Sequence, residues 1–274
     1  MRILLVGDLH YDMRQLDWVL GEADGFDLVV LVGDLLDISS SVALDAQVSV
    51  MLGYLERLAA RGAEVVVCSG NHDLTGRDAD GEKAALWLPQ VTAFGIHTDL
   101  SSMTLRAGPG PGGGAGGGAG GGAGGGPDGD LLTICPWWDG PVGRARVEQF
   151  LVEQQAVRAS MGSGRWLWAY HWPPPDLPVS WTGTRSYGDA DLAGWIERFE
   201  PDLVLTGHVH QAPLANGGSW VARCGTSWVV NAGRQIGPRP SHIIIDLDAW
   251  SASWWSFEAA GEQALSIAGA AGAQ

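Results

Sequence analysis

Residues 28–37 read LVVLVGDLLD, five apolar residues followed by a turn that carries Asp34 and Asp37. A short apolar run that ends in a Gly-Asp turn is typical of a strand buried on both faces, with a polar loop at its carboxyl end. The pattern occurs again on either side of this stretch. Residues 3–6 and residues 64–68 are short apolar runs, and each leads into a turn that contains glycine. The three runs predict three buried strands.

The segments between these runs have helical character. Residues 13–22 could form one helix, and residues 42–60 carry apolar side chains at helical spacing. The resulting strand–helix alternation predicts an α/β layered fold with parallel strands. Further strands are expected at residues 131–135, 166–170, 203–206, 227–230 and 243–247, with helices near 144–160 and 189–198. Because residues 220–257 hold several close strand candidates and no helix, we expect antiparallel pairing there.

A Gly- and Ala-rich segment, residues 107–129, interrupts the pattern. A segment of this composition cannot form a buried core, and the polar motifs described below occur on both sides of it. We therefore expect one domain over residues 1–274, with this segment as a long surface loop between two strands. Residues 259–274 are also rich in Ala and Gly, and we expect them to be a frayed tail.

Charge and cysteine content narrow the functional classes. Sixteen basic residues against thirty-one acidic ones give a formal charge of −15, which repels polyanions and argues against long nucleic acids as partners. The three cysteines form no metal-binding pair and no even-numbered disulfide framework, which favours a reducing compartment. No apolar run resembles a signal peptide or a membrane span. We expect a soluble cytoplasmic protein without membrane contact; the sequence does not indicate its oligomeric state.

Five polar motifs follow the expected strands. They are Asp8-Leu-His10, Gly33-Asp34-Leu-Leu-Asp37, Gly70-Asn71-His72-Asp73, His171 and Gly207-His208-Val-His210. Carboxyl ends of strands in α/β sheets converge on one crevice, so residues far apart in sequence can meet there. Taken singly, the motifs are ordinary turns or a core histidine. Together they hold five of the seven histidines and indicate a metal centre.

The residue types suit a pair of divalent cations. Carboxylate, imidazole and amide oxygen accommodate manganese, iron, zinc or nickel. Side chains two residues apart in an extended segment point to the same side, so Asp8 and His10 would face the same way, as would His208 and His210. Asp34 could bridge two ions through its two carboxylate oxygens. A purely structural zinc site would favour a closed shell of four ligands rich in cysteine, and the sequence shows no such set of ligands.

The five motifs together resemble the calcineurin-like metallophosphoesterase superfamily, whose pattern is D-x-H, G-D-x-x-D, G-N-H-[D/E], H and G-H-x-H. The resemblance covers residues 3–210. It implies a four-layer α/β/β/α sandwich of two mixed sheets flanked by helices, and two divalent metal ions. It also implies a phosphoric ester hydrolase.

Carried over residue by residue, the resemblance implies a role for each motif. The first metal would be held by Asp8, His10 and His210, the second by Asn71, His171 and His208, and Asp34 would bridge them. His72 would be catalytic beside the substrate phosphate, oriented by a second catalytic residue, Asp73. Asp37 would support the site or cap its loop without binding metal.

Two-metal chemistry predicts in-line attack on phosphorus by water that the cations have activated as hydroxide. We expect a small phosphodiester as substrate. The alternatives are a phosphomonoesterase or a nuclease at the same site, or a scaffold without catalysis. Four tryptophans could line a substrate pocket or could equally pack in the core: Trp137, Trp138, Trp172 and Trp228. Three arginines could contact phosphate, and the sequence does not rank them: Arg77, Arg185 and Arg234.

Overall fold

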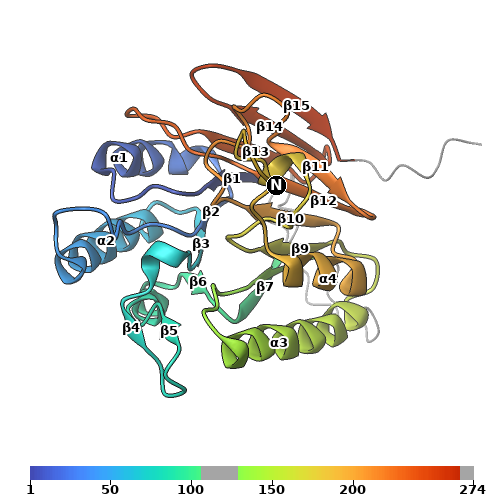
Figure 1. Ribbon diagram of the computed structural model, residues 1–274, viewed down its shortest axis with the longest axis horizontal. Coiled ribbons are helices and arrows are strands. Elements are labelled where there is room, and N and C mark those ends of the chain that lie inside the picture. Colours follow the sequence, from blue (N-terminus) through green and yellow to red (C-terminus); the bar gives the residue numbers. More distant parts are fainter. Residues whose placement is uncertain (106–128, 266–274) are drawn as a thin grey trace, which may run out of the picture.

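The computed structural model describes residues 1–105 and 129–265, in which the apolar runs form the strands of two packed β-sheets (Figure 1). The first sheet has the order β15-β14-β13-β1-β2-β3-β6. Its strands are β1 (Arg2–Val6), β2 (Leu28–Val32), β3 (Glu64–Cys68), β6 (His97–Thr98), β13 (His242–Asp246), β14 (Ser251–Trp255) and β15 (Ala260–Ala264). The first four are parallel, and the last three join antiparallel, so the sheet is mixed.

The second sheet is also mixed and has the order β11-β12-β10-β9-β8-β7. Its strands are β7 (Ser101–Leu105), β8 (Asp130–Ile134), β9 (Trp166–Ala169), β10 (Leu203–Thr206), β11 (Val221–Cys224) and β12 (Ser227–Asn231). The four central strands are parallel, whereas the edge strands β7 and β11 are antiparallel to their neighbours. A small hairpin of β4 (Gly76–Arg77) and β5 (Lys83–Ala84) stands apart from both sheets.

Helices cover the two outer faces, which completes the expected four-layer sandwich (Figure 1). Helices α1 (Met13–Glu22) and α2 (Leu44–Ala59), with the 3₁₀ segment η3 (Leu88–Phe94), pack on the first sheet. Helices α3 (Pro141–Ser160) and α4 (Ala190–Phe199) pack on the second. The shorter 3₁₀ turns are η1 (Ala23–Gly25), η2 (Asn71–Asp73) and η4 (Pro178–Ser180).

Alternation along each strand divides the apolar runs between two layers of core. In β1, Ile3 and Leu5 face the other sheet, whereas Leu4 and Val6 face the helices. Strand side chains alternate with a period of two, so a run without polar residues is what a strand covered on both faces requires. The continuous run in residues 28–32 follows the same rule, because every residue of β2 is buried.

The carboxyl terminus departs from the sequence prediction. Residues 260–264 form β15, which pairs with β14, and Leu265 is fully buried against the inter-sheet core. The expected fraying is therefore wrong for this part, because the edge of the sheet supplies backbone partners that composition does not reveal. Residues 266–274 lie outside the described residues.

The glycine-rich segment joins two neighbouring strands, as predicted. Leu105 at the end of β7 pairs with Asp130 at the start of β8 in an antiparallel register. Residues 107–128 themselves lie outside the described residues. Antiparallel pairing within residues 220–257 is also confirmed, although β12 and β13 belong to different sheets.

Among residues 1–105 and 129–265, no helix has both the length and the apolar character that crossing a membrane demands.

Candidate metal centre

The predicted site residues lie in loops at the carboxyl ends of parallel strands. Asp8 and His10 follow β1, Asp34 follows β2, and Asn71 begins the turn after β3. From the second sheet come His171, after β9, and the pair His208 and His210, after β10. The edge where these strand ends meet is therefore lined by side chains from both halves of the chain, as the topology rule predicts.

Four of these residues have left-handed backbone conformations. Their φ angles are 56° at Asp8, 44° at His10, 54° at Asp34 and 66° at His208. Only a few per cent of non-glycine residues adopt such angles, and each costs on the order of 1–3 kcal/mol. Bonds between neighbouring loops hold the conformation: the His10 amide donates to the Asp34 carbonyl at 2.8 Å. The folded chain thus maintains strain at the residues that carry the chemistry.

Asp8, His10, Asp34 and His210 form the first ligand set. One ligand atom from each lies within 4.8 Å of the others. The Nε2 atoms of His10 and His210 are 3.0 Å apart, and His210 Nε2 is 3.1 Å from Asp8 Oδ1. Two ring nitrogens and a carboxylate that converge so closely can share one cation.

Asp34, His171 and His208 form the second set, within the same 4.8 Å limit. His171 Nε2 lies 3.3 Å from Asp34 Oδ2 and 3.2 Å from His208 Nδ1. The other ring nitrogen of His171, Nδ1, lies 2.6 Å from the Val32 carbonyl oxygen and donates to it, so in the neutral ring Nε2 is the nitrogen that is free to bind a metal at the centre. Asp34 belongs to both sets, which is the geometry that a bridging carboxylate needs.

Asn71 supplies an independent test of whether the site fits a metal ion. Its Oδ1 atom is buried and has no hydrogen-bond partner among the described residues. An orphaned buried acceptor is costly, and a cation is one group that would satisfy it. The next residue supports this placement, because the His72 amide donates to Asp34 Oδ1 at 2.8 Å. Together with the two ligand sets, the orphaned oxygen fits a pair of divalent ions held by oxygen and imidazole.

Burial and charge set the protonation of the ligands. Burial lowers the pKa of His10 to about 4 and that of His208 to about 3, which keeps both rings in the neutral form that binds metal. Burial alone would also lower the pKa of His171, but the Asp34 charge outweighs it and raises that pKa to about 9. Burial would raise the pKa of Asp34, and His171 and His10 instead hold it below its usual range. A cation that enters would replace the proton of His171 as the partner of Asp34.

Asp73 does not orient His72, which corrects the sequence expectation. Its buried carboxylate accepts four backbone N–H groups, at 2.8 Å from Asp34 and Gly70 and at 3.0 Å from Leu35 and Leu36. Successive side chains in a 3₁₀ turn diverge by about a third of a circle, so the side chain after His72 points elsewhere. Asp73 is a structural clamp between two ligand loops.

The carboxylate that accompanies His72 is Asp37. Its Oδ1 lies 3.6 Å from His72 Nδ1, and it also accepts the Ser39 amide at 2.8 Å. Nδ1 of His72 accepts the Ile38 amide at 3.3 Å. These contacts agree with the supporting, loop-capping role that the sequence suggested for Asp37. Asp37 and His72 also approach His10, and one ligand atom from each of the three lies within 4.8 Å of the others.

Glycine at position 33 allows the two sheets' ligand loops to approach each other. Gly33 has a φ of 81°, and a Cβ atom there would lie 2.6 Å from His171 Nδ1 and 2.7 Å from the Gly70 nitrogen. Any side chain would clash with a ligand and a backbone that cannot yield.

Two of the four candidate tryptophans border the centre. Trp137 and Trp172 stack with ring centroids 5.0 Å apart, and both lie close to the His208 ring. Tyr187, which no motif indicated, stacks on His208 at 5.3 Å. The other two tryptophans pack elsewhere. The Trp138 indole donates to Tyr170, and the Trp228 indole donates to the Leu265 carbonyl beside the inter-sheet core.

The structure also ranks the three candidate arginines. Arg234 lines a cavity of about 450 Å³ together with His210 of the first ligand set. Arg185 lies over the Tyr187 ring at 5.3 Å and is exposed. Arg77 lies on β4 and donates to the Gly81 carbonyl at 2.6 Å. Arg234 is thus the candidate that shares a cavity with a predicted metal ligand.

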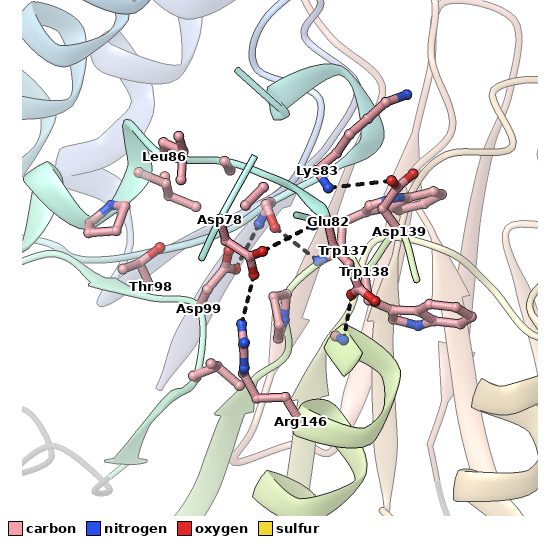
Figure 2. Close-up of a pocket in the computed structure, with 18 of the residues that line it drawn as sticks. Asp78, Glu82, Lys83, Leu86, Thr98, Asp99, Trp137, Trp138, Asp139 and Arg146 are labelled. Carbon is pink, nitrogen blue, oxygen red and sulfur yellow. Dashed lines mark hydrogen bonds and ion pairs between the residues drawn. The ribbon is translucent and has the colours of Figure 1, made fainter. Parts of the chain in front are cut away.

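A second cavity, of about 370 Å³, lies between the β4–β5 hairpin and the start of α3 (Figure 2). Four carboxylates line it, against two basic residues. They are Asp78, Glu82, Asp99 and Asp139, with Lys83 and Arg146. Arg146 is occupied by an ion pair with Asp78 at 3.3 Å, as Figure 2 shows. This cavity is acidic, and Trp137 separates it from the imidazoles of the second ligand set.

Comparison with known proteins finds a matching family and solved structures of similar fold. The model of the calcineurin-like phosphoesterase family matches residues 1–212. The protein TT1561 of Thermus thermophilus has a similar structure, with a TM-score of 0.56 and 14% identity over 97% of this chain and 99% of that one. A dimetal phosphatase from Danio rerio is similar with a TM-score of 0.55 and 12% identity, over 93% and 95% of the two chains. No curated protein is significantly similar in sequence.

Asp34→Ala should remove metal from both ligand sets, because Asp34 belongs to both. Asp45→Ala is the matched control, since it removes an exposed carboxylate in the first turn of α2 that belongs to none of the candidate ligand groups. Elemental analysis after dialysis should show near-complete loss in Asp34→Ala and normal content in Asp45→Ala. Equal metal content in the two variants would contradict the bridging assignment.

Asp73→Ala should destabilise the fold and empty the centre together. Four buried N–H donors would lose their acceptor, and each unsatisfied buried group costs about 1–3 kcal/mol. Chemical denaturation should therefore show a loss of several kcal/mol in the metal-free protein, where metal contributes nothing. A variant of normal stability that lost only turnover would restore a catalytic role for Asp73.

Proposed function

Because this chain belongs to the calcineurin-like phosphoesterase family, we propose that it is a metal-dependent hydrolase of small phosphodiesters. The observation that carries the proposal is the sharing of Asp34 between two ligand sets that contain four histidines. Divalent cations bound at two adjoining sites polarise phosphoryl oxygens and activate water as a nucleophile at neutral pH. The complete ligand arrangement argues against a scaffold without catalysis.

His72 is placed to act on the leaving group. Its Nδ1 accepts the Ile38 amide, so the proton of the neutral ring is on Nε2. The ring lies 4.4 Å from that of His10, and the side chain is 18% exposed, which leaves it within reach of a substrate beside the first ligand set. Nε2–H can donate to the departing oxygen or to a phosphoryl oxygen as negative charge develops there.

Space beside both ligand sets favours a diester over a monoester. A cavity borders His210 of the first set, and the exposed ring of Tyr187 lies beside His208 of the second. A diester has two ester groups on phosphorus, so it needs room on two sides, whereas a monoester needs room on one. Tyr187, 41% exposed, offers an aromatic surface next to His208 on which a base or ring could stack.

The charge of −15 argues for small substrates, because a long nucleic acid would be repelled along its whole length. The acidic second cavity has the same effect locally. We therefore favour a compact phosphodiester, with one ester group in the cavity beside His210 and the other beside Tyr187, over single-stranded or duplex nucleic acid.

Manganese-loaded protein should hydrolyse bis-p-nitrophenyl phosphate with a higher kcat/KM than p-nitrophenyl phosphate, and should degrade single-stranded DNA poorly at physiological salt. Chelation of the metal should abolish turnover, and the Asp34→Ala variant is the control for contaminating hydrolases. Full activity in chelated protein would reject a metal-dependent hydrolase. A clear preference for the monoester, or rapid DNA degradation, would reject the substrate assignment alone.

His72→Ala should lower kcat by roughly 10²–10⁴-fold, the usual cost of losing one proton donor or charge-stabilising group. Its metal content should stay normal, because the ring is not part of either ligand set that shares Asp34. His97→Gln, on the short strand β6, is the matched control and should keep wild-type kcat. Metal loss in His72→Ala comparable with that in Asp34→Ala would show that His72 binds metal.

A further inference from the structure

Arg234 is a cation beside the metal centre without an acidic partner. Among the described residues, seven other arginines pair with carboxylates at 4.0 Å or less, but Arg234 does not. Its Nε atom is buried and has no hydrogen-bond acceptor among the described residues. Arg223 and Arg239 also lack a carboxylate partner in the described part of the chain, and each has a buried guanidinium nitrogen without an acceptor there. Their guanidinium groups, however, lie over the rings of Trp228 and Trp255, at 4.7 and 3.7 Å from the ring centroids. Among the described residues, Arg234 has no such aromatic contact. A guanidinium nitrogen is a donor only, so its missing partner is an acceptor.

The backbone fixes Arg234 relative to the ligand loop. Asn231, buried at the end of β12, donates from Nδ2 to the Val209 carbonyl at 3.1 Å and accepts the Gly233 amide at 2.7 Å. The Arg234 amide in turn donates to the His210 carbonyl at 3.1 Å. Gly233, with a φ of 65°, makes the turn possible. These bonds attach the base of the arginine directly to the loop that carries His208 and His210.

The cavity that Arg234 lines has two kinds of wall. His210, Gln211 and Thr182 are polar, whereas Leu214, Ala215 and Ile236 are apolar. Ile236 is 87% exposed, an unusual state for a large aliphatic residue next to a polar site. No carboxylate lines this cavity, in contrast to the four in the cavity of Figure 2. Of the two cavities, this one is therefore suited to an anion with an apolar substituent.

We propose that Arg234 binds the phosphate of the substrate and that Leu214, Ala215 and Ile236 receive one of its ester groups. This inference rests on the proposed hydrolysis of phosphate esters. A guanidinium matches two phosphate oxygens with parallel N–H donors, and the buried Nε gains the acceptor that it lacks. Arg234 and the cavity thus determine which diesters fit the side of the first ligand set.

The test is the binding of inorganic phosphate to the metal-loaded protein, measured by calorimetry. Arg234→Gln should bind phosphate roughly 10- to 100-fold more weakly, the effect of losing charged hydrogen bonds, with unchanged metal content. Arg234→Lys should recover only part of the affinity, because ammonium lacks the fork. Arg77→Gln, which removes the same charge from the β4–β5 hairpin, should stay within twofold of wild type. Wild-type affinity in Arg234→Gln, or no phosphate binding by the wild-type protein, would overturn the inference.

A second variant tests the apolar wall. Ile236→Ser should raise KM for bis-p-nitrophenyl phosphate several-fold without changing the affinity for inorganic phosphate, which has no ester group. An unchanged KM would reject the ester-binding role. The outcomes also separate the two proposals: phosphate binding that depends on Arg234, in a protein without esterase activity, would reject the function and retain the anion site. Diester hydrolysis and phosphate binding that are both unaffected by Arg234→Gln would reject the anion site and retain the proposed function.

Discussion

The buried carboxylate of Asp73 joins the loops that follow β2 and β3, and the position of Asp34 depends on it. It accepts the amides of Asp34, Leu35, Leu36 and Gly70, and the main-chain carbonyl of the same residue accepts the Trp87 indole at 3.0 Å. Burial and the nearby Asp34 charge raise the pKa of Asp73 to about 7, against the opposing effect of the Gly70 and Leu36 amides and of His171. Two buried carboxylates so close together favour a cation between the loops. The clamp therefore orders the ligands and contributes to the charge that attracts metal.

Much of the fold could be predicted because the signals are local. A buried parallel strand such as β2 must be apolar throughout, and the helix over residues 44–59 presents its stripe within its own sequence. Strands β14 and β15 were harder to predict, since their pairing depends on a sheet edge that forms only in three dimensions. The sequence did not indicate β6 and β7 for the same reason, because they are short, partly polar and stabilised by their neighbours.

The site follows the same division between local and long-range information. Asp8, Asp34, His171, His208 and His210 could be identified because a ligand must end a strand and must be a metal-binding residue type. The distinction between Asp37 and Asp73 could not be predicted from spacing, because the directions of side chains in the η2 turn decide which carboxylate meets His72. Nor could Tyr187 be found, since it lies in an irregular loop and acts through stacking alone. Arg234 was a candidate among three until its link to His210 distinguished it.

The pairing of Leu105 with Asp130 has a consequence for how the chain can be divided. A break between these residues would leave an amino-terminal fragment with Asp8, His10, Asp34 and Asn71, and a carboxyl-terminal fragment with His171, His208 and His210. Each ligand set draws on both fragments, and the first sheet does too, because β13 of the second fragment pairs with β1. Neither fragment alone could assemble either ligand set. Metal capture would then be a direct readout of fragment complementation, with reassembly of the sandwich and formation of the centre as a single event.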